Sequence, residues 1–443
     1  MKKNLSEAHP KSFPRGRTLK TFLLIIISLP FGKGGGWAFS QNYCGSPRYD
    51  TEVFTNVTTS SNVIYGQNID INGNTQILLM DVYEPTGDVA VKRPLIVFAH
   101  GGAFVVGSKT DSYCVDICTA FAKRGYVAVS IEYRMGMGFP ITAQVFETTI
   151  WRAMQDMKAA IRFFRKDAAT TNTYKIDPNY IFGGGASAGG ITAVQVGYLD
   201  KSSEVPIAID TTILGGLEGN SGSSGYSSYV NAIINYCGAV MDTSFILPGD
   251  KPMITAQGDM DEIVPYCSDM IKDLIGIPIM PMHGGGAMNI RAYHIGLQNP
   301  IHTFYGQNHI SPSTGANLDT TILLTSDFLF QQLGCSPVNT IPYTNKPTCP
   351  GSPPPPPPTA TSELIFSDEN INLFPNPSRG EFQISSTKFQ VEGVEVYDVL
   401  GNIIAEKILN SKFGTLNLNI ASGIYTVKIS SGENSVMKKL IIE

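Results

Sequence analysis

Three kinds of feature are scarce in this chain, and each scarcity removes a class of function. The 443 residues include 32 basic and 37 acidic side chains, a formal net charge of −5, and no run of Lys or Arg forms a basic stripe in the body of the chain. Nucleic-acid binding therefore has little electrostatic support. None of the seven cysteines has the Cys-x-x-Cys or Cys/His spacing that is typical of zinc sites, so no metal centre is predicted.

Long apolar runs are also scarce. The clearest one, Thr21–Phe31, follows a basic N-terminus and is too short to span a bilayer as a helix. Ala38 and Ser40 provide the small residues that a signal peptidase reads. We therefore predict a signal peptide at residues 1–40 and no stable transmembrane segment. A short membrane anchor is the alternative, which the proline and glycines that interrupt the apolar run disfavour.

The odd number of cysteines bears on disulfide pairing. In an exported protein cysteines can form disulfides, and an odd count leaves at least one free or paired between molecules. Cys237 and Cys267 each follow a predicted core strand, so they are the first expected pair. Cys335 with Cys349 is the second.

The body of the chain, residues 41–340, alternates strand-like and helical patterns. Such alternation favours an α/β fold with a mostly parallel sheet that is covered on both faces. The clearest helix is Thr149–Lys166, whose apolar residues recur on one face, and a closing helix is expected at Thr320–Leu333. Strands are expected at 75–83, 94–99, 126–131, 180–183, 232–236, 253–256 and 301–305.

The composition changes after this segment. Pro353–Pro358 are six consecutive prolines, which predict a semi-rigid linker over residues 341–362. Residues 363–443 carry short alternating apolar runs between turn signals and predict a small all-β, immunoglobulin-like domain.

One pentapeptide indicates nucleophilic catalysis. Gly185-Ala186-Ser187-Ala188-Gly189 matches the nucleophile elbow, in which small residues let a sharp turn hold a serine hydroxyl exposed. The pattern alone is weak, but a predicted strand precedes it and a helix is expected to begin near Gly190. This is the strand–elbow–helix order that the chemistry needs. The alternative is a glycine-rich turn with a passive serine.

A second glycine-rich segment suggests an oxyanion hole. His100-Gly101-Gly102-Ala103-Phe104 follows the apolar strand 94–99 directly. Backbone N–H groups that bind a developing oxyanion need a close approach of the chain, which glycines allow. We expect the N–H groups of Gly102, Ala103 and Ala188 to be the donors and the His100 ring to order the loop. An ordinary strand-to-helix turn is the alternative.

The acid and the base of a triad must follow the serine in this order. Asp261 fits best as the acid, with Asp259 second and Glu262 expected to be solvated. His309, in a loop after the last core strand, is the expected base. The other two histidines of this region, His302 and His294, are expected to be structural.

Three further segments surround these motifs. His283-Gly284-Gly285-Gly286 resembles an oxyanion motif, but it follows the elbow and no clean buried strand leads into it, so we interpret it as a surface loop. The segments Met135–Thr148 and Leu217–Tyr229 either line or cover the site, or are plain loops.

Residues 75–310 resemble α/β-hydrolase carboxylesterases in six ordered motifs: LMDVYEP, VFAHGGAFVVGS, GYVAVSIEYR, GGGASAGG, GDMDEIVPY and GQNH. The resemblance implies the α/β-hydrolase fold and a secreted serine hydrolase of short acyl or aryl esters, with Ser187, Asp261 and His309 as the triad and no cofactor. The alternatives are a serine peptidase of the same fold, an esterase acting on polyesters or plant cell-wall acetyl or feruloyl esters, and a non-catalytic surface protein.

The final residues resemble the C-terminal sorting domain of the type IX secretion system, in LFPNPSRGEFQIS, VEVYDVLGNII, SGIYTVKIS and the closing MKKLIIE. The resemblance implies that the secretion machinery is a partner. It also implies passage through the periplasm and removal of the domain at the cell surface. An adhesive or sugar-binding sandwich is the alternative.

Overall fold

The computed structural model describes residues 43–206, 209–273, 275–337, 343, 349, 371–386, 391–398, 402–411, 413–431 and 434–443. The expected signal peptide and most of the expected linker lie outside the described residues. The chain divides into two compact units, residues 1–355 and 356–443. The finer boundaries at 40, 340 and 362 stay predictions.

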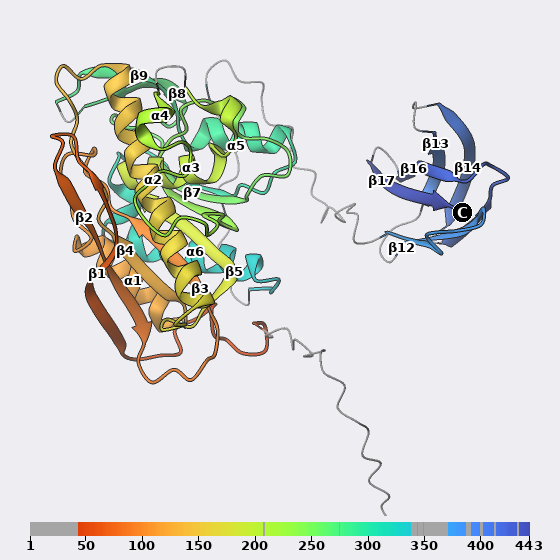
Figure 1. The fold of residues 1–443 in the computed structure, drawn as a ribbon, viewed down its shortest axis with the longest axis horizontal. Helices are drawn as coiled ribbons and strands as arrows, with labels where there is room; N and C mark the ends of the chain where they lie inside the picture. Colours follow the sequence, from red (N-terminus) through yellow and green to blue (C-terminus); the bar gives the residue numbers. More distant parts are fainter. Residues whose placement is uncertain are drawn as a thin grey trace, which may run out of the picture. The chain divides into compact units, whose positions relative to one another are not determined.

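Eight strands form the sheet of the first unit, in the order β1-β2-β4-β3-β5-β6-β7-β10 (Figure 1). The two pairs that involve β2 are antiparallel, and every other neighbouring pair in this sheet is parallel. The predicted α/β fold with a mostly parallel sheet is confirmed. The strands are β1 Val57–Ile69, β2 Thr75–Pro85, β3 Arg93–Ala99, β4 Val127–Ile131, β5 Ile176–Ala186, β6 Ala232–Tyr236, β7 Met253–Gly258 and β10 Ile301–Phe304.

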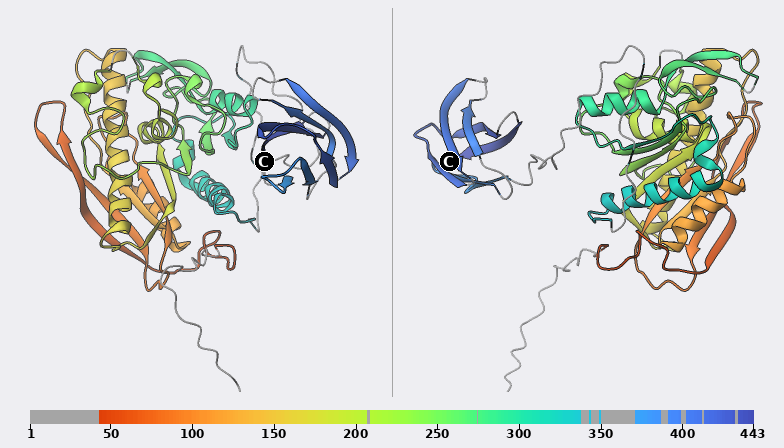
Figure 2. Two further views of the ribbon diagram at one scale, coloured as in Figure 1. Left: turned by 45° about the vertical axis from the view of Figure 1, so that its right-hand side comes forward. Right: turned by 180° about the vertical axis from the view of Figure 1, so that it is seen from behind.

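Helices cover both faces of this sheet (Figures 1 and 2). On one face α2 (Ala143–Ala169) packs against α3 (Ala188–Tyr198), and on the other α1 (Ser112–Lys123) lies near α6 (Gly315–Gln332). Successive residues of β3 alternate between two hydrophobic cores: Leu95, Val97 and Ala99 join the first core, and Ile96 and Phe98 the second. Burial on both faces explains why these strands are unbroken apolar runs in the sequence.

The remaining elements of the first unit connect or flank the sheet. A two-stranded antiparallel hairpin, β8 (Ser268–Lys272) and β9 (Pro278–His283), precedes helix α5 (Gly285–His294). The short helices are α4 (Thr211–Leu214) and three 3₁₀ turns, η1 (Ser202–Glu204), η2 (Thr243–Phe245) and η3 (Ser311–Ser313).

The strands of the sheet were predicted well from the sequence, but other elements were not. Helix α2 begins before the expected Thr149, because the Thr142 side chain caps it by accepting a hydrogen bond from the Val145 N–H at 3.3 Å. Strand β1 was not expected, since it is a half-exposed edge strand with many polar residues. The hairpin β8–β9 was missed for the same reason.

Both expected disulfide pairs are wrong. The bridges are Cys44–Cys335, with a Cα–Cα distance of 5.3 Å, and Cys267–Cys349, at 5.5 Å. Cys237 is buried and carries a free thiol at the end of β6. The pairing joins segments far apart in the sequence, 291 and 82 residues, so local strand context did not predict it.

In the described part of the second unit, seven antiparallel strands form two sheets, β11-β12-β15 and β14-β13-β16-β17. Side chains from both sheets, including Phe382, Val394 and Val427, form one buried core. The expected small antiparallel β domain is confirmed. The strands are β11 Ile371–Phe374, β12 Glu381–Ser386, β13 Val391–Tyr397, β14 Ile403–Ser411, β15 Phe413–Asn417, β16 Gly423–Ser431 and β17 Asn434–Ile442.

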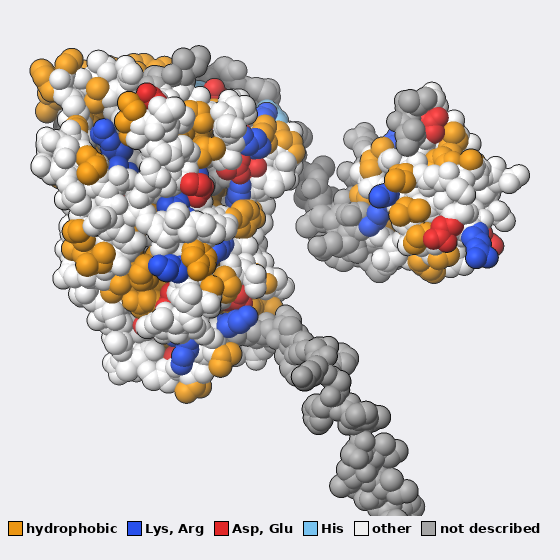
Figure 3. Space-filling view, in the orientation of Figure 1, with side chains coloured by type: hydrophobic (Ala, Val, Ile, Leu, Met, Phe, Trp, Pro, Cys, Tyr) orange, Lys and Arg blue, Asp and Glu red, His pale blue; other side chains and the backbone are white. Residues whose placement is uncertain are grey.

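On the face drawn in Figure 3, basic and acidic side chains are interspersed over the first unit. Among the helices of the described residues, none combines the length and apolar character needed to cross a bilayer.

The disulfide pairing gives the first testable prediction. Replacing both Cys44 and Cys335 with serine should lower the free energy of unfolding by about 2–4 kcal/mol, because the bridge restrains the unfolded chain. Denaturant titration measures this loss. Peptide mapping without reduction should find Cys44 linked to Cys335 and Cys267 linked to Cys349, and a peptide linking Cys237 to Cys267 would contradict the structure.

Candidate active site

Ser187 lies in a strained turn between β5 and α3. Its backbone has φ 54° and ψ −120°, a conformation that non-glycine residues rarely adopt. The flanking glycines are required sterically: a Cβ on Gly185 would lie 2.2 Å from the Gly189 carbonyl carbon, and a Cβ on Gly189 would lie 2.0 Å from the Ala99 oxygen. The pentapeptide therefore forms the sharp strand-to-helix elbow that its sequence predicts.

The structure brings together the three residues expected to form a triad. His309 follows β10, and its Nε2 atom lies 2.8 Å from Ser187 Oγ. Its Nδ1 atom lies 2.7 Å from Asp261 Oδ2, which follows β7. The three side chains come from the carboxyl ends of β5, β7 and β10, which a parallel sheet places at one edge. This edge is the usual ligand-binding edge of open α/β sheets.

The surroundings distinguish the two competing acids. The Asp261 side chain is fully buried, and its Oδ1 accepts hydrogen bonds from the N–H groups of Ile263 (3.0 Å) and Val264 (2.9 Å). Gln257 Nε2 donates to Oδ2 at 3.0 Å. Asp259 instead accepts from the Gly306 N–H at 2.6 Å and caps a turn. Gln257, which orients the acid, was not anticipated from the sequence.

The groups around the His309 ring stabilise the cation that it forms when it takes up a proton. Burial lowers its pKa, but the Cys237 thiol group and the Asp261 carboxylate beside it outweigh burial, so the pKa lies above the ordinary value of 6.5. A cation stabilised in this position is what a general base becomes when it takes the proton of a serine. Cys237, which was wrongly expected in a disulfide, is a free cysteine next to the imidazole.

The loop after β3 presents backbone donors beside the serine. An ideal Cβ on Gly101 would lie 3.2 Å from Ser187 Cβ, so the loop and the elbow touch. The Gly101 N–H donates to Tyr113 OH at 2.6 Å. Within the described chain, the N–H groups of Gly102, Ala103 and Ala188 make no hydrogen bond. These three expected donors therefore stay available to a ligand.

A small cavity, with a volume of about 20 Å³, opens beside Ser187. Its walls are mainly apolar, with Met137 and Phe146 from the expected segment 135–148. The hairpin β8–β9 contributes Ile271 and Ile279, which the sequence did not indicate. The other expected segment, 217–229, contributes to a separate groove with Lys158 and Lys251. The full lining is Ala103, Phe104, Met137, Phe146, Ser187, Ala188, Ile191, Ile263, Val264, Ile271, Lys272, Asp273 and Ile279.

The expectation that His283–Gly286 is a surface loop is wrong. His283 ends β9, and Gly284, Gly285 and Gly286 are buried where α5 begins. A Cβ on Gly284 would lie 1.7 Å from the Pro265 oxygen, so the glycines serve close packing under the hairpin. His294 ends α5 and His302 lies in β10, as expected.

Two family models match the chain. The BD-FAE model matches residues 80–243, and the Secretion system C-terminal sorting domain matches residues 372–443. In the first unit residues 80–243 are thus similar to the BD-FAE family, and in the second unit residues 372–443 are similar to a secretion sorting domain. The sorting domain indicates export. Among the described residues, no group of three or more His, Cys, Asp or Glu side chains is placed to hold a metal ion.

Curated relatives are similar to about a quarter of this chain. Mouse (Mus musculus) Carboxylesterase 3B is 34% identical over 116 residues, 26% of this chain and 19% of that protein. Rat (Rattus norvegicus) Neutral cholesterol ester hydrolase 1 is 32% identical over 114 residues, 26% of this chain and 25% of that protein. The chain thus spans a quarter or less of the length of these two relatives.

The chain is also similar to solved structures of the esterase 2 of Thermogutta terrifontis. Its paraoxon-phosphorylated form is 24% identical to this chain with a TM-score of 0.44, covering 62% of this chain and 94% of that one. The propionate-bound form is 23% identical with the same TM-score and the same coverage.

The geometry around His309 predicts a specific titration. By NMR, the His309 ring should titrate above pH 6.5, and Asp261→Asn should lower that pKa by removing the carboxylate. Because the folded-state pKa is raised, the stability contributed by this group is full below pH 6.5 and is lost as pH rises through the folded pKa.

A matched control tests the cause of this shift. Asp259→Asn removes a carboxylate two residues from Asp261, which accepts a hydrogen bond from the Gly306 N–H and not from His309. This variant should leave the His309 titration unchanged. His302, whose pKa burial lowers, should titrate below 6.5 in every variant. An equal shift in the two Asp variants would contradict the assignment of Asp261 as the partner.

Proposed function

We propose that this protein is a secreted serine esterase that cleaves carboxylic esters with short acyl groups through an acyl-enzyme. The observation that carries the proposal is the hydrogen-bonded chain from Ser187 through His309 to Asp261, with distances of 2.8 and 2.7 Å. A nucleophile, a base within hydrogen-bond reach and a third group that orients the base are the signature of nucleophilic acyl transfer.

The reaction has two halves. His309 Nε2 takes the proton of Ser187 Oγ as this oxygen attacks the ester carbonyl carbon. The protonated His309 then gives that proton to the departing alcohol oxygen, and the acyl group stays on Ser187. In the second half His309 takes a proton from water, the hydroxide attacks the acyl-enzyme, and the free acid leaves as Ser187 regains its proton. Asp261 holds the tautomer throughout.

The tetrahedral intermediates carry a negative oxygen. The N–H groups of Gly102, Ala103 and Ala188 are the donors in this proposal. Loss of one such donor typically slows catalysis about 100- to 1000-fold. Ala103 supplies its N–H in a left-handed conformation with φ 52°, so an alanine fills the place that glycine usually takes.

The size of the cavity supports a short acyl group. Its volume, about 20 Å³, is far below that of the pockets that hold drug-sized ligands. Buried side chains, Phe104, Ile271 and Val264, close it. The sorting domain supports the finer proposal of export by the type IX machinery to the extracellular space or outer cell surface.

The direct test is ester hydrolysis by the full chain. The wild type should hydrolyse p-nitrophenyl acetate and butyrate faster than the octanoate. Ser187→Ala should lose at least about 1000-fold in kcat/KM, because the nucleophile is gone. Mass spectrometry should find the acyl adduct on Ser187. Equal activity in wild type and variant, or none in a folded wild type, would refute the proposal.

The acyl pocket predicts a change of specificity. Ile271→Ala removes a buried side chain from the cavity wall and should raise the octanoate-to-butyrate ratio of kcat/KM by roughly 10-fold. Ile277→Ala is the matched control, because Ile277 is 54% exposed on the same hairpin and does not line the cavity. The same octanoate-to-butyrate ratio in both variants would show that the hairpin does not limit the length of the acyl group.

A further inference from the structure

We propose that Glu132 is a positioning residue, whose carboxylate clamps both ends of the oxyanion loop, His100–Lys109. The inference rests on the proposed esterase function, because it assigns a role in presenting the donors Gly102 and Ala103. Glu132 directly follows β4 and does not contact Ser187 or His309. Its effect on the reaction is therefore indirect.

At the first end of the loop the clamp acts through His100. The His100 ring is fully buried, and its Nε2 lies 3.4 Å from Glu132 Oε2. Nδ1 lies 2.7 Å from the Gly101 oxygen, and because a carbonyl only accepts, Nδ1 carries a hydrogen there. The contact between Nε2 and the Glu132 carboxylate is therefore an ion pair of the doubly protonated ring. The Tyr133 ring stacks on the imidazole at 4.5 Å, and its hydroxyl donates to the His100 oxygen at 2.9 Å.

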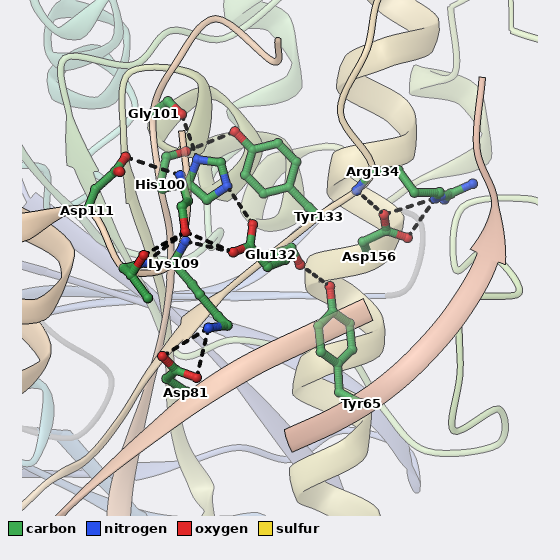
Figure 4. Close-up of polar contacts among 12 residues, drawn as sticks. Tyr65, Asp81, His100, Gly101, Lys109, Asp111, Glu132, Tyr133, Arg134 and Asp156 are labelled. Atoms are coloured by element: carbon green, nitrogen blue, oxygen red, sulfur yellow. Dashed lines mark hydrogen bonds and ion pairs between the residues drawn. The ribbon is translucent and has the colours of Figure 1, made fainter. Parts of the chain in front are cut away.

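At the second end the same carboxylate accepts two hydrogen bonds through its other oxygen. Glu132 Oε1 accepts from Ser108 Oγ and from the Lys109 N–H, each at 3.1 Å. The Lys109 ammonium group pairs with Asp81 Oδ1 at 3.0 Å, which anchors this end to β2. Figure 4 shows the Glu132 carboxylate between the His100 ring and the Lys109 backbone.

The clamp is itself rigid and charged. The Glu132 backbone N–H donates to the Leu79 carbonyl oxygen at 2.8 Å, and the Glu132 backbone carbonyl oxygen accepts from Tyr65 OH at 2.5 Å. Burial raises the pKa of the Glu132 carboxyl, but its hydrogen bonds with His100 and Lys109 outweigh burial and lower the pKa overall. Glu132 therefore carries a carboxylate, and hydrogen bonds to β1 and β2 fix its backbone.

The segment between the two ends needs such support. Gly102, Ala103 and Phe104 all have positive φ, of 106°, 52° and 63°. Two of these are non-glycine residues, whose strain persists only where surrounding contacts hold it. The loop has no regular secondary structure, so its donors depend on the fixed ends. A displacement of about 1 Å at a catalytic group can cost 100-fold in rate.

The test compares two Glu132 variants in the full chain. Glu132→Ala releases both ends, and kcat for p-nitrophenyl butyrate should fall about 10- to 100-fold while KM changes less than about 3-fold, because the donors act mainly in the transition state. Affinity for a trifluoromethyl ketone, which forms a tetrahedral adduct, should fall in parallel. Hydrogen exchange at residues 101–107 should become faster.

Glu132→Gln should rescue most of this loss. Its amide oxygen can accept from Ser108 and Lys109, and its NH₂ group can donate to Nε2 of a neutral His100. The loop therefore keeps its position without the charge. If Glu132→Ala does not fold, Glu132→Asp takes its place, because a side chain one methylene shorter cannot reach both ends, and the same direction of change is expected.

Asp88→Ala is the matched control. The Asp88 side chain is 3% exposed and pairs with Arg48 and with Arg93, the first residue of β3, at the opposite end of that strand from the site. This variant should lose stability without a change in kcat or in exchange at 101–107. Unchanged kcat and exchange in a folded Glu132→Ala variant would overturn the clamp, as would equal losses in the Ala and Gln variants. Inactivity of the wild type would refute the esterase function, while the exchange data would still decide the clamp.

Discussion

The approach of Gly189 to the carbonyl oxygen of Ala99 is the contact on which the site depends. A Cβ at residue 189 would lie 2.0 Å from that oxygen, so the first turn of α3 rests directly on the end of β3. Ser187 lies two residues before this contact, and the oxyanion loop begins one residue after it. The proposed nucleophile and its proposed donors are therefore two parts of one packed junction, which only a residue without a Cβ permits at position 189.

The parallel sheet extends this junction to the rest of the triad. Because β5, β7 and β10 run in one direction, the loops that follow them meet at one edge and bring Asp261 and His309 to the serine. The buried acid would be costly without partners. Two backbone N–H groups and the Gln257 amide provide them, and they leave Asp261 Oδ2 directed at the imidazole. The site is thus made of loops held by a rigid scaffold.

The sequence predicted the parts of this arrangement that local patterns determine. Strand β3 is apolar throughout because both of its faces are buried, and the elbow needs small residues for a steric reason that is visible in its own pentapeptide. Choosing between Asp259 and Asp261 is different, because the choice depends on a hydrogen bond from Gly306, far along the chain. The disulfides and the packing of Gly284 under the hairpin are long-range contacts of the same kind. Glu132 belongs to the GYVAVSIEYR motif, but its proposed role depends on a contact with His100, 32 residues earlier in the chain.

Part of the backbone strain of this molecule lies where the proposed chemistry takes place. Of the nine non-glycine residues with positive φ in the described chain, four lie in or beside the site: Ala103, Phe104, Ser187 and Cys237. Phe104 shows how such strain is held: it is fully buried, with Tyr133 and Phe146 at ring distances of 6.1 and 5.8 Å. The same ring lines the acyl cavity. Shape of the pocket and position of the oxyanion donors are therefore coupled through one side chain, so a larger pocket obtained by shortening Phe104 would also release the loop that presents Ala103.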